Sequence, residues 1–587
     1  MIAIATEPGG DGYLGFTQRF ASTAKGWDQA LCTHWVSAWI RASGSGAMDY
    51  RPWRHGLLIG VDHPVETGRS PPEPATLQAL LAERWGAYLA LEVDEPRRQI
   101  RLMRDPSGRL ECWRLQLSGV DIFFSHWDDV AAAACTRFTL NWDYIHYHLH
   151  NDWDQGAETA CKEIEEVIRG QAVFYENGQS RTELLWRPDQ IAEDSYATLE
   201  EARFGIRKAA ELVVRGWASR YQRIGVNLSG GLDSAIVLGL LTKAANHPDI
   251  ICINHGIEDA EGDEVRYARD AARFNNVKLD EVTITIEDAR STPSFSRRLF
   301  RPTMRMMSLG YDRVGTDFVT RHDRQALFTG SGGDHVFFDN LGVLAACDYR
   351  RRHRRLADLP GLLRTVHGLA QVSRDTVWRA ALLVVLDQVG VGSRRNSIGG
   401  AYDARYLTEV GRRLPDHRRF EHPWSRLARE SAPPAKRGQM ESFVDLQRHY
   451  YRYGFADAAD ETHPFMAQPM LEAGLRTPAY WFAANDRQRG LARTTFADVI
   501  PASIRDRRTK SYNSSHWRAV VAQKLPEFRS VLLDGYLVER GLVDRNVIDR
   551  ELTASGLSGD GAFGMLITCL TTELWIRQAE RDHDLVP

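Results

Sequence analysis

The first third of the chain alternates apolar and polar residues over short stretches. Residues 57–59, 99–103 and 120–124 are apolar or alternating runs of this kind. A period of two places one face of a strand against a core and leaves the other face polar. The pattern therefore predicts a β-rich region with short helices that extends to about residue 200.

The pattern changes at residue 199, where apolar residues begin to recur near helical spacing as far as residue 220. Short apolar runs then alternate with stretches that we expect to be helical, in the order 224–228, 235–245, 250–254, 263–273 and 279–286. Strands that alternate with helices predict a parallel sheet with right-handed crossovers, whose ligands lie at the carboxyl ends of the strands. The predicted fold class is α/β, with a β-rich part followed by a parallel-sheet part that carries helical additions.

The string Ser229-Gly230-Gly231-Leu232-Asp233-Ser234 joins the first strand of this sheet to its helix. Adjacent glycines let the backbone approach an anion, while serine hydroxyls, turn amides and the positive end of the helix dipole favour phosphate. Asp233 adds a carboxylate that suits Mg²⁺ bound to those phosphates. A tight turn without a ligand would also use Gly-Gly and Ser, but the complete string in this position favours a phosphate site.

A second glycine-rich turn, Thr329-Gly330-Ser331-Gly332-Gly333-Asp334-His335, follows another apolar strand end. Both turns resemble motifs of the asparagine synthetase superfamily of ATP pyrophosphatases, and residues 500–510 resemble the stretch that ends in the catalytic lysine of these enzymes. The resemblance implies ATP and Mg²⁺ as cofactors, with Asp233 and Asp334 sharing the metal. It also implies that Lys510 stabilises the charge that develops on the reacting phosphates, whereas the alternative is one more lysine in a basic loop.

The same resemblance implies a set of nucleotide-binding residues. These are Leu228, Ser229, Gly230, Gly231, Leu232, Asp233, Ser234, Ile253, Asn254, Thr329, Gly330 and Lys510. The ends of the first two strands, at Leu228 and at residues 253–254, would hold adenine, although a role in a buried strand explains these residues equally well.

The turn Arg104-Asp105-Pro106-Ser107-Gly108 resembles one in the glutamine amidotransferase domain of asparagine synthetases. The resemblance implies two domains: residues 1–198 as a degenerate N-terminal-nucleophile (Ntn) amidotransferase-like sandwich, and residues 199–587 as an ATP-dependent, amide-forming PP-loop domain. Glutaminase chemistry there needs a cysteine directly after the initiator methionine. Ile2 stands at that position, so we expect no glutamine hydrolysis and no ammonia. The first domain would then serve as a structural support or a docking surface.

The second turn also departs from the family motif. Ser331 stands where the family has a glutamate that acts as a base toward the attacking amine, and His335 replaces the final glutamate. A serine is not a base at neutral pH, whereas an α-amine with a pKa of about 7.7–8.0 needs little help to lose its proton. The departure therefore points to a peptide N-terminal amine as the nucleophile.

Two branches of the superfamily lack the glutaminase cysteine, the lasso peptide macrolactam synthetases and the β-lactam synthetases. The chain resembles the first branch more closely through its length and the string of residues 329–335. That resemblance implies a lasso peptide cyclase, which adenylates an Asp or Glu side chain of a precursor-derived core peptide and joins it to the peptide's N-terminal amine. A leader peptidase and a leader-binding protein would be its partners.

Three alternatives remain open at this point. The first is a β-lactam synthetase that acts on a small β-amino acid. The second is a tRNA-modifying ATP pyrophosphatase, which would usually carry a basic RNA-binding surface or a catalytic cysteine pair. The third is a non-catalytic scaffold that binds nucleotide or peptide, and the presence of Asp233, Asp334 and Lys510 together argues against it.

The composition bears on which partners and which cellular compartment to expect. Among 587 residues, 74 Lys and Arg against 77 Asp and Glu give a net charge of −3, which demands neither nucleic acid nor an anionic membrane as a partner. The seven cysteines are scattered without a C-x-x-C pair, as expected for a reducing cytoplasm. The longest apolar run, residues 380–386, is too short to span a bilayer. We therefore expect a cytoplasmic enzyme.

Overall fold

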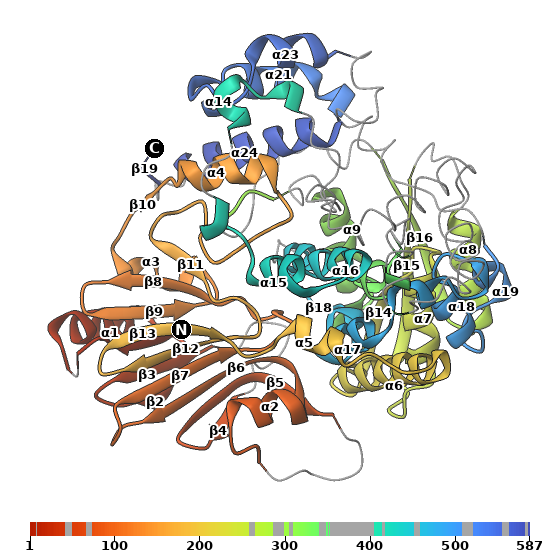
Figure 1. The fold of residues 1–587 in the computed structure, drawn as a ribbon, viewed down its shortest axis with the longest axis horizontal. Helices are drawn as coiled ribbons and strands as arrows, with labels where there is room; N and C mark the ends of the chain where they lie inside the picture. The colour runs from red at the N-terminus through yellow and green to blue at the C-terminus, as the bar shows by residue number, and fades with distance from the viewer. Residues whose placement is uncertain are drawn as a thin grey trace.

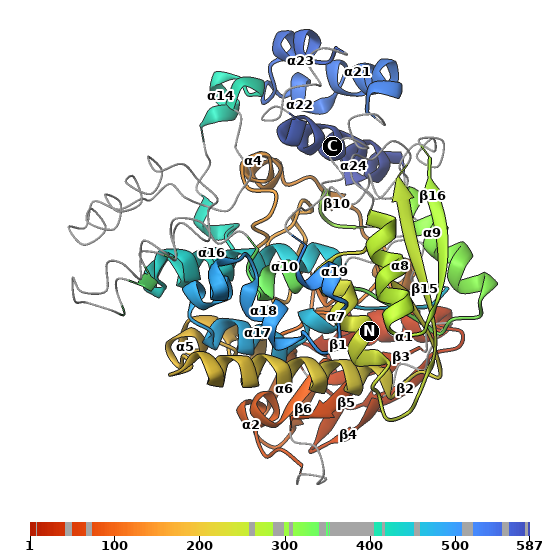
Figure 2. The ribbon, with the colours of Figure 1, turned by 90° about the vertical axis from the view of Figure 1, so that its right-hand side faces the viewer.

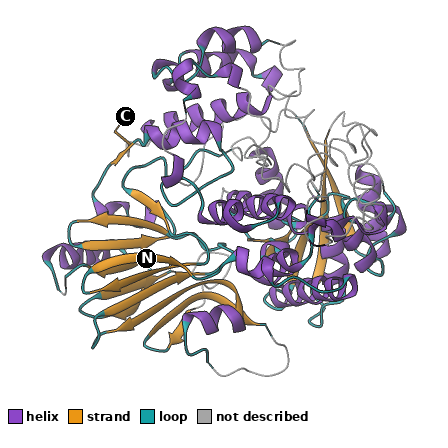
Figure 3. Ribbon diagram, in the orientation of Figure 1, coloured by secondary structure: helices purple, strands orange, loops and turns teal. Residues whose placement is uncertain are grey.

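The computed structural model describes most of the chain. The described residues are 1–7, 9–41, 50–65, 73–257, 264–285, 299–303, 309–339, 345, 348–349, 352, 404–413, 417–450, 458–507, 521–553, 563–581 and 585–586. Figure 1 shows a β-rich part formed by the first residues and a helix-rich part beside it, and Figure 3 shows the same division by secondary structure.

The β-rich part contains two six-stranded antiparallel sheets. In spatial order the first sheet has β11 (Ile164–Glu166), β8 (Trp113–Leu117), β9 (Val120–Phe124), β1 (Ile2–Ala5), β3 (Val36–Ile40) and β2 (Asp28–Cys32). The second has β13 (Gln179–Leu184), β12 (Gln171–Glu176), β7 (Gln99–Arg104), β6 (Arg84–Asp94), β5 (Gly56–Pro64) and β4 (Tyr50–Trp53). The runs predicted as strands at residues 57–59, 99–103 and 120–124 lie in β5, β7 and β9.

The two sheets pack face to face. Ile2 and Ile4 of β1 lie in one core with Leu91 and Leu102 of the second sheet, whereas Ala3 lies in a different core on the outer side. Because successive side chains of a strand point to opposite faces, each sheet can pack on both sides. The outer core of the first sheet includes residues of α1 (Asp11–Thr23), α3 (Ala131–Ala134) and α4 (Trp142–His150).

A third sheet is parallel, as the sequence pattern predicts. Its spatial order is β16 (Lys278–Ile284), β15 (Asp249–Ile257), β14 (Arg223–Asn227), β17 (Ala326–Phe328) and β18 (Asp460–Thr462). The chain moves outward from β14 to β15 and β16, and then returns to place β17 on the other side of β14. Such a reversal creates a crevice at the carboxyl ends of the two central strands, where α/β proteins bind ligands.

Helices lie around this sheet, and those expected over residues 199–220, 235–245 and 263–273 lie near their predicted positions, with one correction. The helices around the sheet are α6 (Leu199–Ala218), α7 (Leu232–Leu241), α8 (Glu264–Phe274), α9 (Leu309–Arg321) and α10 (Gly333–Val336). The sequence pattern placed the second of them at residues 235–245, but α7 begins at Leu232 because Gly231 is already its N-cap. Asp233 therefore lies in the first turn of the helix, where the macrodipole favours a negative charge.

Helix α6 joins the two parts of the molecule. Trp217 of α6 contacts Trp85 of β6 with ring centroids 5.8 Å apart, and Val213 and Ile206 belong to the same core. Figure 2 shows α6 running between the second sheet with α2 (Leu77–Glu83) on one side and the helices α17 (Gln468–Arg476) and α18 (Gly490–Thr495) on the other. The outer face of the second sheet and the parallel sheet thus share one hydrophobic core.

The other helices of the described ranges lie elsewhere. They are α5 (Pro188–Glu193), α14 (Glu409–Arg412), α15 (Pro423–Ser431), α16 (Pro434–Asp445), α19 (Ala502–Arg505), α21 (Leu525–Leu533), α22 (Tyr536–Glu539), α23 (Arg545–Glu551) and α24 (Phe563–Arg581). Buried residues of the last four, α21 to α24, belong to the core on the outer side of the first sheet. The last strand, β19 (Leu585–Val586), pairs in parallel with β10 (Phe138–Thr139). Of the helices in the described ranges, none combines the length and the apolar character that a membrane crossing requires.

The turn at residues 104–108 connects β7 to β8, as predicted, but it is buried. Arg104 forms an ion pair with Glu166 at 2.7 Å, and the carbonyl of Gly108 accepts a hydrogen bond from the Gln447 side chain. Burial raises the pKa of Asp105 to about 6. The turn therefore lies where the β-rich part meets the helices.

Candidate functional site

The loop between β14 and α7 has the backbone form of an anion cradle. Gly230 has φ = 81°, in the left-handed region where glycine carries no steric penalty. The Ser229 hydroxyl accepts a hydrogen bond from the Gly231 amide at 3.2 Å and lies 3.1 Å from the Ser234 hydroxyl. The side chains of Leu232 and Ser234 are buried, and the α7 N-terminus opens on the loop.

The second glycine turn, between β17 and α10, lies directly against this loop. A Cβ atom on Gly330 would come within 2.5 Å of the Ser234 nitrogen, and one on Gly333 within 2.3 Å of the Asp233 carboxyl carbon. Only glycine allows this approach. The carboxyl ends of the paired strands β14 and β17 therefore bring together the two turns that the sequence singles out, and we call this place the crevice.

Asp233 and Asp334 converge on a residue that sequence reasoning missed. Nη1 of Arg489 donates to Asp233 Oδ2 at 2.7 Å and to Asp334 Oδ1 at 2.6 Å, and its Nε forms an ion pair with Asp339 at 3.2 Å. The Arg489 side chain is only 7% exposed. Burial lowers its pKa, but the three carboxylates raise it by more, so that the net shift is upward.

Arg489 reaches the carboxylates from the start of α18. Its φ of 54° is in the left-handed region, and a Cβ on the next residue, Gly490, would come within 1.7 Å of the Ala484 carbonyl oxygen. A tightly constrained turn therefore fixes the direction of the arginine. The sequence around it, Asp486-Arg487-Gln488-Arg489-Gly490, contains no motif that would have identified it.

A second arginine connects the C-terminal region to the first loop. Arg507 donates to the carbonyl of Gly230 at 3.3 Å and to Glu264 of α8 at 3.0 Å, and its guanidinium lies 4.2 Å from the centroid of the Tyr267 ring. Lys510, the predicted catalytic lysine, lies outside the described residues. The described chain therefore reaches the cradle three residues before it.

The predicted adenine contacts lie at the ends of β14 and β15. Leu228 and Ile253 are buried, and the Leu228 amide donates to the Ile253 carbonyl at 2.8 Å. Asn254 donates its side-chain amide to the Leu228 carbonyl at 2.7 Å. These bonds tie the two strand ends together beside the cradle.

Thr329 connects the second turn to β18. Its hydroxyl accepts from the Ser331 amide at 3.1 Å and lies 2.7 Å from Nδ1 of His463, a buried imidazole just after β18. Residues 464–466 follow as a buried 3₁₀ turn. An imidazole and a hydroxyl are thus linked next to Ser331, where the family has a glutamate.

The two carboxylates suit a magnesium ion that arrives with phosphates. Within the described ranges, no group of three or more His, Cys, Asp or Glu residues is arranged to hold a metal by itself. Mg²⁺ in nucleotide sites usually takes one or two carboxylates and completes its shell with phosphates and water. Asp233 and Asp334, whose oxygens already converge on one cationic nitrogen, provide such a pair.

The N-terminus shows what occupies the place of a glutaminase nucleophile. Ile2 is buried between the two sheets, and the Met1 amino group donates to the Trp39 carbonyl at 2.8 Å. Burial lowers the pKa of this amino group to about 5. The first two residues are therefore packed into the sandwich.

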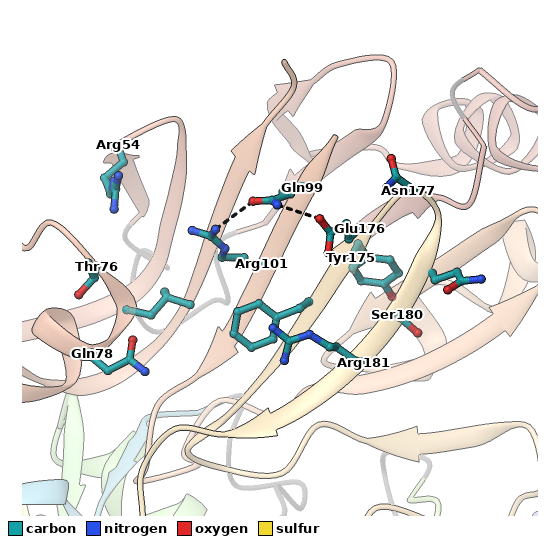
Figure 4. Close-up of a pocket in the computed structure, with 13 residues that line it drawn as sticks. Arg54, Thr76, Gln78, Gln99, Arg101, Tyr175, Glu176, Asn177, Ser180 and Arg181 are labelled. Carbon is teal, nitrogen blue, oxygen red and sulfur yellow. Dashed lines mark hydrogen bonds between the residues drawn. The ribbon is translucent and has the colours of Figure 1, made fainter. Parts of the chain in front are cut away.

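A separate cavity lies in the β-rich part. It has a volume of about 640 Å³ and is lined by residues of the second sheet and α2, among them Arg54, Arg101 and Arg181 (Figure 4). Arg101 pairs with Glu92 at 2.9 Å and Arg181 with Glu183 at 2.8 Å. None of the residues of the two glycine turns lines it, so it is not part of the crevice site.

The chain is similar to an established protein family. The asparagine synthase family model matches residues 211–577, which is more than half of the chain. No curated protein matches. Among solved structures, a U34-tRNA thiolase, NcsA, from Methanococcus maripaludis is 14% identical with a TM-score of 0.19, and the match covers 43% of this chain and 76% of that one.

A glutamine-dependent NAD⁺ synthetase from Acinetobacter baumannii, in complex with ADP, is 11% identical with a TM-score of 0.18, over 53% of this chain and 70% of that one. TM-scores this low do not identify a shared architecture. The family match includes both glycine turns, Arg489 and Lys510. The chain therefore belongs to the asparagine synthase family and is an ATP-dependent amide ligase.

Proposed function

We propose that this ligase closes a macrolactam within a peptide. It would adenylate an Asp or Glu side chain of a core peptide and join it to the peptide's own N-terminal amine, as a lasso peptide cyclase does. A leader peptidase and a leader-binding protein would supply the substrate with its free amine.

The observation that carries this proposal is the burial of Ile2 between the two sheets. A glutaminase needs a nucleophilic thiolate at that position. We infer from Ile2 that the protein draws no ammonia from glutamine, so that the amine would belong to the substrate or to a second substrate. Ser331 gives weaker support, because an N-terminal α-amine needs less help from a base than ammonia does.

Each part of the crevice has a place in the adenylation step. The substrate carboxylate attacks the α-phosphate of ATP, and pyrophosphate leaves. The loop at residues 229–234 would hold the phosphates with its amides and the α7 N-terminus. Asp233 and Asp334 would hold Mg²⁺, which neutralises phosphate charge when bound, and Lys510 would stabilise the charge on the α-phosphate and the leaving pyrophosphate.

The second step forms the amide. The N-terminal amine attacks the acyl carbon, AMP leaves with the bond electrons, and the amine loses a proton. Holding both ends of one peptide in the crevice raises their effective concentration, which is where much of the rate would come from.

The test is mass spectrometry of synthetic peptides incubated with the purified full chain and Mg-ATP. The peptides have a free N-terminus and one Asp or Glu that is moved along the sequence, and N-acetylated copies serve as matched controls. AMP and pyrophosphate are assayed in the same tube. Asp334→Ala and Lys510→Ala test the site, and Lys208→Ala, which removes an exposed lysine on α6, is the control variant.

We expect the loss of one water per peptide, matched by one AMP, with the free-amine peptides only. The activity should be absent in Asp334→Ala and Lys510→Ala and retained in Lys208→Ala. Formation of AMP without dehydration would contradict the proposed amine and retain the activation step. Dehydration of a small β-amino acid but of no peptide would replace the proposal with a β-lactam synthetase.

A further inference from the structure

Arg489 occupies the point at which the two metal-binding candidates meet. A single nitrogen, Nη1, lies 2.7 Å from an oxygen of Asp233 and 2.6 Å from an oxygen of Asp334. Both are charge-assisted hydrogen bonds of good length. Because the guanidinium is buried, its charge is balanced by these carboxylates rather than by water.

A metal ion that bridges the same two oxygens would compete with this nitrogen. Magnesium lies about 2.0–2.1 Å from its oxygen ligands. An ion shared by these two oxygens would therefore have to take the place of Nη1 or lie in close contact with it. Two cations in contact inside a partly buried site repel strongly.

Asp339 offers the arginine another partner. It forms an ion pair with Nε at 3.2 Å, on a different part of the guanidinium from the shared nitrogen. A rotation of the end of the side chain could therefore release Asp233 and Asp334 while Arg489 remains paired. The released nitrogens could then donate to phosphate oxygens, which a planar guanidinium binds well.

We propose that Arg489 is an internal counter-cation, which neutralises Asp233 and Asp334 in the nucleotide-free protein and is displaced when a divalent metal binds there. The inference rests on the metal role of these two residues in the proposed function. A metal ion that binds alone must break the two charge-assisted hydrogen bonds of Arg489. A metal ion that binds with nucleotide brings phosphate oxygens, which can accept hydrogen bonds from the displaced guanidinium. Metal and nucleotide should therefore each strengthen the binding of the other.

The experiment measures Mn²⁺ binding to the full chain without nucleotide, by the electron paramagnetic resonance signal of the free ion. In Arg489→Gln we expect Mn²⁺ to bind about tenfold more tightly or better than in the wild type, because no bond to the arginine has to be broken. Arg487→Gln is the matched control. It removes a positive charge two residues away, from a side chain that pairs with Asp506 at 3.5 Å, and should leave the affinity unchanged.

Asp334→Asn separates this inference from the proposed function. Loss of Mn²⁺ binding in Asp334→Asn supports the metal site, and unchanged affinity in Arg489→Gln would then overturn the role of the arginine alone. Unchanged binding in Asp334→Asn would overturn both.

The wild-type protein provides a second readout should Arg489→Gln fail to fold. Phenylglyoxal modifies accessible arginines, and peptide mapping shows which have reacted. Saturating Mn²⁺ should increase modification of Arg489 and not of Arg487, since displacement exposes a side chain that is otherwise 7% exposed. No increase at Arg489 would contradict displacement.

Discussion

Single arginines bind the two glycine turns to the C-terminal region. The sequence singles out Asp233 and Asp334 because each lies in a short glycine-rich string with its own physical rationale, and their role stays a prediction. Arg489 could not be predicted, because it lies 155 residues along the chain from Asp334, and its neighbours carry no motif. A contact at that separation depends on how β17, α10 and α18 are packed, which local periodicity does not encode.

Arg507 makes a prediction at this scale. Arg507→Gln removes the hydrogen bonds to the Gly230 carbonyl and to Glu264, so that this side chain no longer links the loop to α8. We expect nucleotide affinity to fall by about tenfold, the equivalent of one charge-assisted hydrogen bond. Isothermal titration with ATP in the presence of Mg²⁺ measures the effect.

Arg505→Gln is the matched control for that experiment. Arg505 is 41% exposed and pairs with its neighbour Asp506 at 2.8 Å, without contact with the loop. Equal losses of affinity in Arg505→Gln and Arg507→Gln would show that the bond to Gly230 does not matter.

At the scale of elements, the site results from the order of the strands. The alternation of strands and helices predicts a parallel sheet, and the glycine strings predict where its ligand lies. The sequence does not predict that β17 pairs with β14. Residues 326–328 are all apolar, and apolar side chains do not specify which strand lies next to them. The glycines at positions 330 and 333 are the sign of this proximity, because a Cβ at either would strike the α7 N-terminus.

Gly333→Ala tests this contact between elements. The added Cβ would lie 2.3 Å from the Asp233 carboxyl carbon, so Asp233 must shift away from Arg489 and Asp334. We expect ATP to bind at least about tenfold more weakly, by the same titration. Gly256→Ala on β15 is the control, because its nearest neighbour would be at 3.6 Å and binding should not change. Wild-type affinity in Gly333→Ala would mean that the two turns are not held together as described.

The whole molecule combines an antiparallel sandwich with a parallel-sheet part. The change of periodicity near residue 199 predicts this succession. The division into domains at residues 198 and 199 stays a prediction, and side chains make contacts across it: Gln468 donates to the Leu81 carbonyl at 2.7 Å, and Trp186 to Glu472 at 3.0 Å. Periodicity indicates which face of an element is apolar, but not which other element covers that face.

Glu573 on α24 links stability to pH. Burial raises the pKa of its carboxyl to about 7, while the Leu537 amide donates a hydrogen bond to it. The unfolded chain has a pKa of about 4.3 at this group. The folded state therefore binds this proton more tightly than the unfolded state does. The stabilisation that the bound proton gives the fold is complete below about pH 4.3 and is lost as the pH rises through about 7.

We expect Glu573→Gln to be more stable than the wild type at pH 8, by on the order of 2 kcal/mol, and to differ less at pH 5. Thermal unfolding midpoints at the two pH values measure this difference. Glu200→Gln, which changes an exposed glutamate on α6, is the control and should not alter the pH dependence. A Glu573→Gln effect of equal size at both values would exclude proton linkage at this residue.

The contact between Trp85 and Trp217 has a consequence for any shorter form of the chain. The face of α6 that carries Ile206, Val213 and Trp217 shares its core with the second antiparallel sheet. Residues 199–587 alone would present part of this apolar stripe, on a helix of 20 residues, to water. Stripes of this kind promote self-association. The sandwich thus covers an apolar face of α6, and we expect a chain shortened to residues 199–587 to associate with itself.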